Sequence, residues 1–169
     1  MRRLAVLGLL IGLVSTADGQ FCRVPKTYNF RVAADYSEHA ESVKECMHYL
    51  ATKPLHHERV FRSSALIYVL SWLEGSPEVV VKTYSELLVF EEECPDLVAE
   101  FIYLLAMDMM SLGRPSDHVL HFHALRKLIL LYKKSEGLVC PSLDKLAVMS
   151  ESEMETWVSV QYRLAVGEH

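Results

Sequence analysis

An apolar stretch at residues 95–113, PDLVAEFIYLLAMDMMSLG, constrains the fold of this chain more than any other feature. Past its first two residues, only Glu100, Asp108 and Ser111 are conventionally polar, and at 100° per residue they fall on one narrow arc of a helix. A helix that is apolar on nearly all sides belongs in the middle of a bundle. This one is too short, and carries carboxylates too near its middle, to span a membrane. We therefore predict an all-α protein built around a central helix at about residues 96–112.

Amphipathic helices are expected on both sides of the central helix, because apolar side chains recur there at spacings of three and four. The expected helices cover residues 35–52, 57–74, 78–93 and 116–135, followed by a short helical turn at 142–148 and a last helix from 150. The segment 78–93 is the ambiguous one, since Val79, Val80 and Val81 are β-branched and favour a strand. Nothing nearby offers it a partner strand, so the helix is preferred.

Three helix ends carry local signals. Asp35 is expected to be an N-cap, with Glu38 reaching back to the backbone as in a capping box. Gly75 suits the left-handed position that follows a helix. Ser150 and Glu153 form a second capping box at the start of the last helix.

A proline falls between each expected helix and the next, and such short breaks favour antiparallel packing of neighbouring helices. The breaks are at Pro54, Pro77, Pro95, Pro115 and Pro141. We predict a compact antiparallel bundle of five to six helices. A solenoid of helical hairpins is the alternative, although no repeated sequence signature supports it.

The first residues have the pattern of a secretory signal peptide. Arg2 and Arg3 precede an unbroken apolar run, and small residues follow it. Cleavage is expected before Gln20, with cleavage after Ala17 as the alternative. The expected organisation is a signal peptide at 1–19, an extended arm at 20–34 and a helical domain at 35–169. The protein is then exported, either periplasmic or secreted, with no transmembrane segment in the mature chain.

Export changes the meaning of the cysteines, because disulfides form in oxidising compartments. The four candidates are Cys22, Cys46, Cys94 and Cys140, and they allow three connectivities that sequence alone does not separate. Cys46 is expected inside a helix and Cys94 at a helix end. The alternative is that some of the four are small buried hydrophobic residues. No CxxC spacing is present, so neither a zinc site nor a thioredoxin-like motif is supported.

The segment at 62–77 reads RSSALIYVLSWLEGSP. It resembles a pattern in a family of small, uncharacterised, exported all-helical proteins of Bacteroidetes-type bacteria, in which an Arg and an aromatic residue precede Trp-Leu-x-Gly-Ser-Pro. A looser similarity extends over residues 36–132. The chain departs from that family in its cysteines and histidines. The resemblance implies export and an all-helical fold, and it implies nothing about chemistry.

Arg62 is oddly placed, because it projects into the apolar arc of its helix. A buried guanidinium needs a carboxylate or carbonyl partner, and Glu100 and Asp108 on the central helix are the natural candidates. One interpretation is a structural ion pair that fixes how the helices pack. The other is a residue that binds an anion or a carboxylate at a cleft.

His118 and His121 lie three residues apart and share a helix face. Such a pair can hold a metal ion together with a carboxylate from a neighbouring helix, but the sequence identifies no third or fourth ligand. The alternative is two histidines at the mouth of the bundle that bond to the backbone. No metal site or cofactor is therefore expected, and His118 and His121 remain metal candidates only for the alternative function below.

The chain has no catalytic signature such as Gly-x-Ser-x-Gly, His-Glu-x-x-His or a glycine-rich phosphate loop. Its formal charge of −5 and its lack of a basic run argue against nucleic acid. We therefore expect an exported module that binds an envelope protein or a small ligand near Arg62, Glu100, Asp108, His118 and His121. The alternatives are a metal-dependent hydrolase that uses His118 and His121, and a purely structural envelope component.

Overall fold

The computed structural model describes residues 22–113 and 115–167, so the expected signal segment at 1–19 lies outside the described residues. The described residues form helices and connections without a strand, which confirms the all-α prediction. The elements are α1 (Ala33–Thr52), α2 (Arg59–Gly75), the single 3-10 turn η1 (Ser85–Leu87), α3 (Asp96–Leu112), α4 (Asp117–Lys133), α5 (Pro141–Ala147) and α6 (Glu151–Val166).

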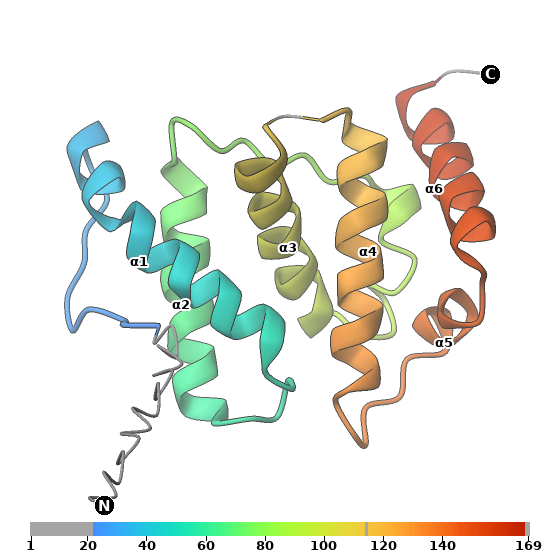
Figure 1. The fold of residues 1–169 in the computed structure, drawn as a ribbon, viewed down its shortest axis with the longest axis horizontal. Helices are drawn as coiled ribbons and strands as arrows, with labels where there is room; N and C mark the ends of the chain where they lie inside the picture. The colour runs from blue at the N-terminus through green and yellow to red at the C-terminus, as the bar shows by residue number, and fades with distance from the viewer. Residues whose placement is uncertain (1–21, 114, 168–169) are drawn as a thin grey trace, which may run out of the picture.

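The helices form a compact bundle in which α2, α3, α4 and α6 lie in a row (Figure 1). Helix α1 crosses one face of this row diagonally and contacts α2, α3 and α4. Short α5 lies below α6 at the end of the row (Figure 1). The bundle prediction is confirmed, with α3 packed between α2 and α4 and covered by α1.

Helix α3 is central for the reason that its sequence indicates. Its buried side chains lie on nearly all sides of the helix, since they include Leu97, Phe101, Tyr103, Leu104, Leu105 and Ala106. Glu100 and Asp108 are buried with them, at 5% and 3% exposure. Two buried carboxylates in an apolar core need partners, and each of them forms an ion pair with a side chain of a neighbouring helix.

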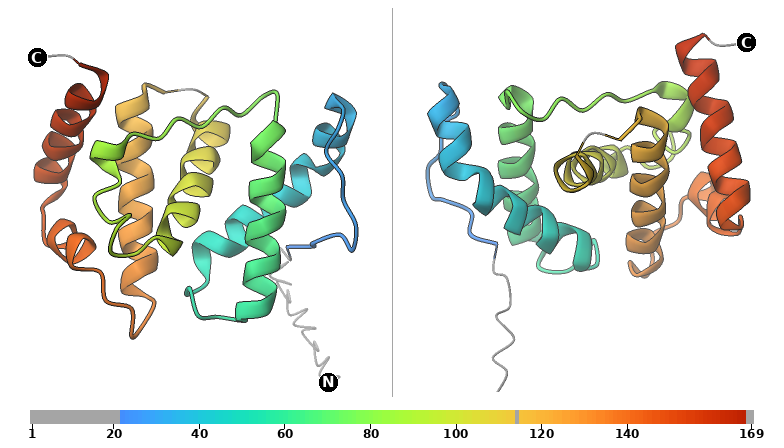
Figure 2. Two further views of the ribbon diagram at one scale, coloured as in Figure 1. Left: turned by 180° about the vertical axis from the view of Figure 1, so that it is seen from behind. Right: turned by 45° about the horizontal axis from the view of Figure 1, so that its top comes forward.

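The prediction of a helix at 78–93 is wrong. Apart from η1, this segment is an irregular connection between α2 and α3. It runs along the back of the row to η1, which lies against α6, and then returns to the start of α3 (Figure 2). Val79, Leu87 and Phe90 are buried, so the segment anchors itself in the core by separate side chains rather than by one helical face.

This connection carries the chain back along the length of the bundle, so α2 and α3 point in the same direction (Figures 1 and 2). The predicted antiparallel packing of sequential helices is therefore wrong for this pair, because the long connection at 76–95 returns the chain to the end where α2 began. Helix α4 then runs antiparallel to α3, and α6 runs antiparallel to α4 (Figure 1). The start of α2 and the start of α3 therefore lie at the same end of the molecule, next to the end of α4.

The N-terminal arm is attached to the bundle in two ways. A disulfide joins Cys22 to Cys46 inside α1. Farther along the arm, Tyr28 packs on Tyr68 of α2 with ring centroids 4.9 Å apart, and Phe30 packs edge-on against His39 of α1. The arm therefore belongs to the folded unit.

Two of the three predicted helix ends are wrong in detail. Helix α1 begins at Ala33, and Asp35 is inside its first turn, where the carboxylate accepts hydrogen bonds from the backbone N–H groups of Arg31 and Val32. These two bonds lower the pKa of Asp35. Gly75 is the last residue of α2 and does not have a positive φ.

Helix α2 begins at Arg59 rather than at His57, because Glu58 precedes it with a left-handed φ of 42° that a continuous helix does not allow. The capping box at the start of α6 is confirmed. Ser150 Oγ accepts from the N–H of Glu153, and the Glu153 carboxylate accepts from the N–H of Ser150.

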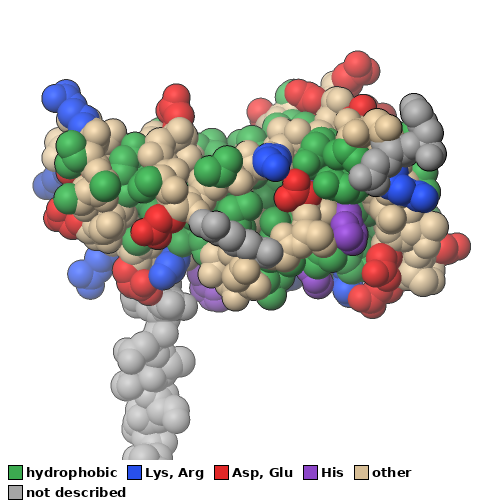
Figure 3. Space-filling view, turned by 90° about the horizontal axis from the view of Figure 1, so that it is seen from above, with side chains coloured by type: hydrophobic (Ala, Val, Ile, Leu, Met, Phe, Trp, Pro, Cys, Tyr) green, Lys and Arg blue, Asp and Glu red, His purple; other side chains and the backbone are tan. Residues whose placement is uncertain are grey.

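None of the helices in the described part of the chain is both long enough and apolar enough to cross a membrane. Seen from above, the molecule shows apolar side chains between scattered acidic and basic ones, with no single sign dominating that face (Figure 3).

Candidate functional site

A cleft of about 780 Å³ opens where the starts of α2 and α3 meet the connection between α4 and α5. We call it the α2–α3 cleft. Its size lies within the range of about 300–1,000 Å³ that is common for ligand pockets. Its apolar lining comes from Leu55, Leu66, Leu97, Leu138 and Val139.

Exposed polar side chains of both signs surround this apolar lining. They are His56, Arg59, Glu93, Asp96 and Glu136. Two further charged residues that line the cleft, Arg62 and Glu100, are buried. The cleft therefore combines an apolar lining, exposed side chains of both charges around it, and a buried ion pair.

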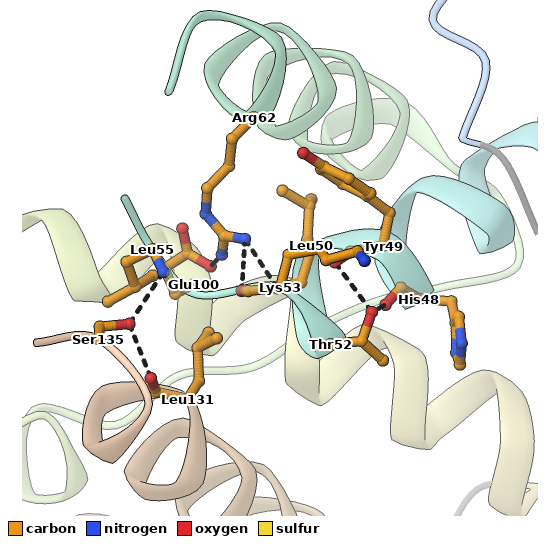
Figure 4. A network of polar contacts seen from close by, with 10 residues as sticks. All are labelled: His48, Tyr49, Leu50, Thr52, Lys53, Leu55, Arg62, Glu100, Leu131 and Ser135. Atoms are coloured by element: carbon orange, nitrogen blue, oxygen red, sulfur yellow. Dashed lines mark hydrogen bonds and ion pairs between the residues drawn. The ribbon is translucent and has the colours of Figure 1, made fainter. Parts of the chain in front are cut away.

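The buried ion pair joins Arg62 of α2 to Glu100 of α3 and lies within a network of polar contacts (Figure 4). Arg62 Nη2 donates to Glu100 Oε2 at 2.5 Å. Its Nη1 donates to the backbone carbonyls of Leu50 at 2.9 Å and Lys53 at 3.1 Å, where α1 ends. The prediction that Arg62 pairs with a carboxylate of the central helix is confirmed, and Glu100 is the partner.

Burial governs the electrostatics of this pair. It raises the pKa of the Glu100 carboxyl, and the neighbouring Arg62 charge offsets only part of that rise. Burial also raises the pKa of the Tyr103 phenol well above its ordinary value, and the nearby Glu100 charge adds to the rise. Tyr103, which the sequence did not single out, is thus part of the surroundings of the pair.

Ser135 is a second residue that the sequence did not indicate. Its hydroxyl accepts from the N–H of Leu55 at 2.9 Å and donates to the carbonyl of Leu131 at 2.8 Å (Figure 4). It therefore ties the connection between α1 and α2 to the end of α4, across the cleft lining. A serine after two lysines gives no sequence signal for such a role.

Glu93 also has an unexpected position. The run of three glutamates at 91–93 gives no sequence signal of a specific partner, but the Glu93 carboxylate accepts from the N–H of Ser142 at 2.8 Å. Ser142 is in the first turn of α5, where backbone N–H groups lack helical partners. Glu93 therefore joins the segment before α3 to the start of α5, on one side of the cleft.

Two of the four cysteines are joined by a disulfide in the structure, and the other two are free. Cys22 and Cys46 form the disulfide described above, while Cys94 and Cys140 are free and buried. Cys94 lines the cleft. Burial raises the pKa of its thiol to about 12, and the adjacent Cys140 thiol contributes to the rise.

Asp108 does not belong to the cleft. Its carboxylate pairs with Lys127 of α4, and it stands eight residues beyond Glu100, about 12 Å along the axis of α3. The sequence offered both carboxylates as partners of Arg62, but only Glu100 pairs with it, and Asp108 belongs to a separate ion pair.

His118 and His121 also lie outside the cleft. His121 is buried, with Nδ1 2.7 Å from the backbone carbonyl oxygen of Asp117 and its ring against Tyr84. His118 is half-buried, and its ring packs against Tyr162 of α6 at 5.8 Å. The two histidines thus pack in the interface among η1, α4 and α6.

Within residues 22–113 and 115–167, no three histidine, cysteine, aspartate or glutamate side chains are grouped so that they could hold a metal ion. Of the five predicted site residues, the structure therefore brings Arg62 and Glu100 to one cleft and leaves Asp108, His118 and His121 elsewhere.

Comparison of the chain with protein-family models, curated proteins and solved structures finds no match.

Proposed function

We propose that this protein is an exported, non-catalytic binding module and that its ligand occupies the α2–α3 cleft. The observation that carries the proposal is the state of the two buried charges in that cleft. Arg62 and Glu100 are engaged with each other at 2.5 Å, and Arg62 also bonds to two backbone carbonyls. Such a pair shapes a cleft without offering a free acid, base or nucleophile.

The lining of the cleft supports an apolar contact at its centre. Leu138 and Val139 are 38% and 74% exposed, so the cleft presents apolar surface to solvent that a ligand would cover. Burial of such surface contributes about 25 cal/mol per Å² to binding before the costs of association.

The charged side chains around the apolar lining support one class of ligand. Arg59 provides positive charge, and Asp96 and Glu136 provide negative charge, all on exposed side chains. A peptide segment of a partner protein fits this arrangement, because it offers an apolar anchor flanked by charged side chains and backbone groups. We therefore propose a segment of another exported protein as the ligand.

The test uses peptides selected from a random phage-displayed library on the full chain, with binding measured by calorimetry. Val139→Asp places a charge in the cleft, and Val148→Asp places the same charge at another exposed valine, outside the cleft. We expect the cleft variant to lose at least about tenfold in affinity and the control to stay within about twofold.

Equal binding of the selected peptides to both variants contradicts the proposed site. A specific turnover by the purified chain that Arg62→Ala abolishes without unfolding the protein contradicts the non-catalytic function. Unlike a loss of binding, a turnover would point back to an enzyme.

Export is tested separately, by mass spectrometry of the chain recovered from its own host without reducing agent. We expect the mass of a chain that begins at Gln20, as the signal pattern predicts. A chain that retains its first residues contradicts export by this signal. The same spectrum reports any retained ligand or metal.

A further inference from the structure

Two buried cysteines with free thiols lie on neighbouring segments at the edge of the cleft. Cys94 is the second residue before α3, and Cys140 is the residue before α5. They are 7% and 0% exposed. Far apart in the sequence, they meet because the segment before α3 and the segment before α5 lie side by side.

Each thiol contacts the residue that precedes the other cysteine. Cys94 Sγ lies 3.5 Å from the carbonyl oxygen of Val139, the residue before Cys140. Cys140 Sγ lies 4.0 Å from a carboxylate oxygen of Glu93, the residue before Cys94. Each thiol thus lies against the chain neighbour of the other. The nearby Cys140 thiol also adds to the raised pKa of the Cys94 thiol.

Both segments are anchored independently of the sulfur atoms. The backbone N–H of Cys94 donates to the carbonyl of Phe90 at 2.7 Å, and that of Cys140 donates to the hydroxyl of Tyr132 at 3.1 Å. Glu93 links the two segments through its bond to Ser142. The two cysteines therefore stay adjacent while their thiols are free.

We propose that Cys94 and Cys140 form a second disulfide, which fastens the start of α5 to the start of α3. The disulfide between Cys22 and Cys46 leaves this pair as the remaining connectivity among the four cysteines. Two cysteines that only filled space in the core would not need to lie each against the chain neighbour of the other, as Cys94 and Cys140 do.

The bond forms by exchange with a small-molecule disulfide such as oxidised glutathione. One protein thiolate attacks a glutathione sulfur, which gives a mixed disulfide and releases one glutathione thiolate. The second protein thiolate then attacks the protein sulfur of that mixed disulfide and releases the second glutathione thiolate. The two protein thiols lose two protons and two electrons in total, and one oxidised glutathione becomes two reduced ones.

The disulfide would hold one wall of the cleft in place. Leu138 and Val139 line the cleft immediately before Cys140, and Cys94 lines it directly. Fastening Cys140 to Cys94 therefore fixes the connection between α4 and α5 as a wall. This consequence rests on the proposed function, whereas the bond itself does not.

The test maps disulfides in the full chain, refolded from the reduced and denatured state in reduced and oxidised glutathione. Refolding is used because a buried thiol with a raised pKa exchanges slowly in the folded protein. We expect an intact mass lower by four hydrogens than that of the reduced chain, and a crosslinked peptide containing Cys94 and Cys140. The thermal midpoint of the doubly oxidised form should exceed that of a Cys94→Ser/Cys140→Ser variant by about 5–10 °C.

The proposal is overturned if Cys94 and Cys140 both react with iodoacetamide under denaturing conditions while Cys22 and Cys46 are linked. It is also overturned if either residue is crosslinked to Cys22 or Cys46. Because the mapping is done on the unmodified chain, it does not depend on whether any variant folds. Loss of peptide binding with an intact second disulfide would count against the proposed function alone.

Discussion

At the scale of single residues, Arg62 joins three helices through one guanidinium. It belongs to α2, closes the end of α1 through the carbonyls of Leu50 and Lys53, and neutralises Glu100 of α3. A buried charge is stable in an apolar core only when such partners replace water. The same residue therefore sets the packing of the helices and the base of the cleft.

Replacing Arg62 by alanine is expected to lower the free energy of unfolding by about 3–5 kcal/mol, because Glu100 is left buried and unpaired. Urea unfolding measures this loss. The double variant Arg62→Met/Glu100→Leu removes both charges and should lose less than the single variant. Arg59→Ala, at an exposed position three residues earlier, should change stability by no more than about 0.5 kcal/mol.

A loss below about 1 kcal/mol in Arg62→Ala contradicts this role, because it would mean that Glu100 finds another partner or water.

At the scale of elements, the contact between α1 and the end of α2 depends on a glycine. Tyr36 of α1 places its hydroxyl where a Cβ at Gly75 would lie, only 2.0 Å away. Tyr36 is held there by a hydrogen bond to the carbonyl of Phe30, and its own carbonyl accepts from the indole N–H of Trp72. Gly75 is thus required by close packing and not by a left-handed φ.

Gly75→Ala is expected to destabilise the protein by about 1–3 kcal/mol through overpacking against Tyr36. Tyr36→Phe removes the blocking oxygen, and the next ring atom is 3.0 Å from the added Cβ. In a double-mutant cycle by urea unfolding, Gly75→Ala should therefore cost less in the Tyr36→Phe background.

An equal cost of Gly75→Ala in both backgrounds would show that the two residues are not coupled, and it would contradict the packing explanation.

At the scale of the whole molecule, the packing of η1, α4 and α6 encloses His121. Its Nδ1 faces the carbonyl oxygen of Asp117, and its Nε2 is buried without a partner among the described residues. Burial lowers the pKa of His121, and the Asp117 carbonyl and carboxylate oppose this shift only in part. Protonation of the folded state would place a charged ring between Tyr84 and Phe101.

The sign of the resulting pH dependence follows from the lowered pKa. Unfolded His121 binds a proton more readily than folded His121, so its contribution to stability is complete above pH 6.5 and is lost as the pH falls toward the folded pKa. Urea unfolding from pH 7.5 to 5.5 should show a steeper loss in the natural chain than in His121→Phe. The difference is at most about 1.4 kcal/mol per pH unit.

The other histidines are the same in both proteins, so their titration cancels in this comparison. Identical pH dependence in the two proteins would contradict the assignment of the effect to His121.

Some of the structure was predictable because its cause is local in the sequence. The apolar pattern of residues 96–112 requires burial on nearly all sides wherever the helix sits, and α3 is the central helix. Ser150 and Glu153 satisfy their own helix end, so their capping box needs no distant partner. A buried Arg62 needed a carboxylate or carbonyl partner, and it has both.

The rest depended on how distant segments meet. Glu100 and Asp108 are equivalent in the helical pattern, and only the placement of α2 and α4 gives one to Arg62 and the other to Lys127. The segment at 78–93 has helical spacing, but burial of separate side chains across the row of helices holds it in an irregular conformation. A periodic pattern specifies which side of a segment is apolar. It does not specify which neighbour covers that side, because the neighbour is brought there by the fold as a whole.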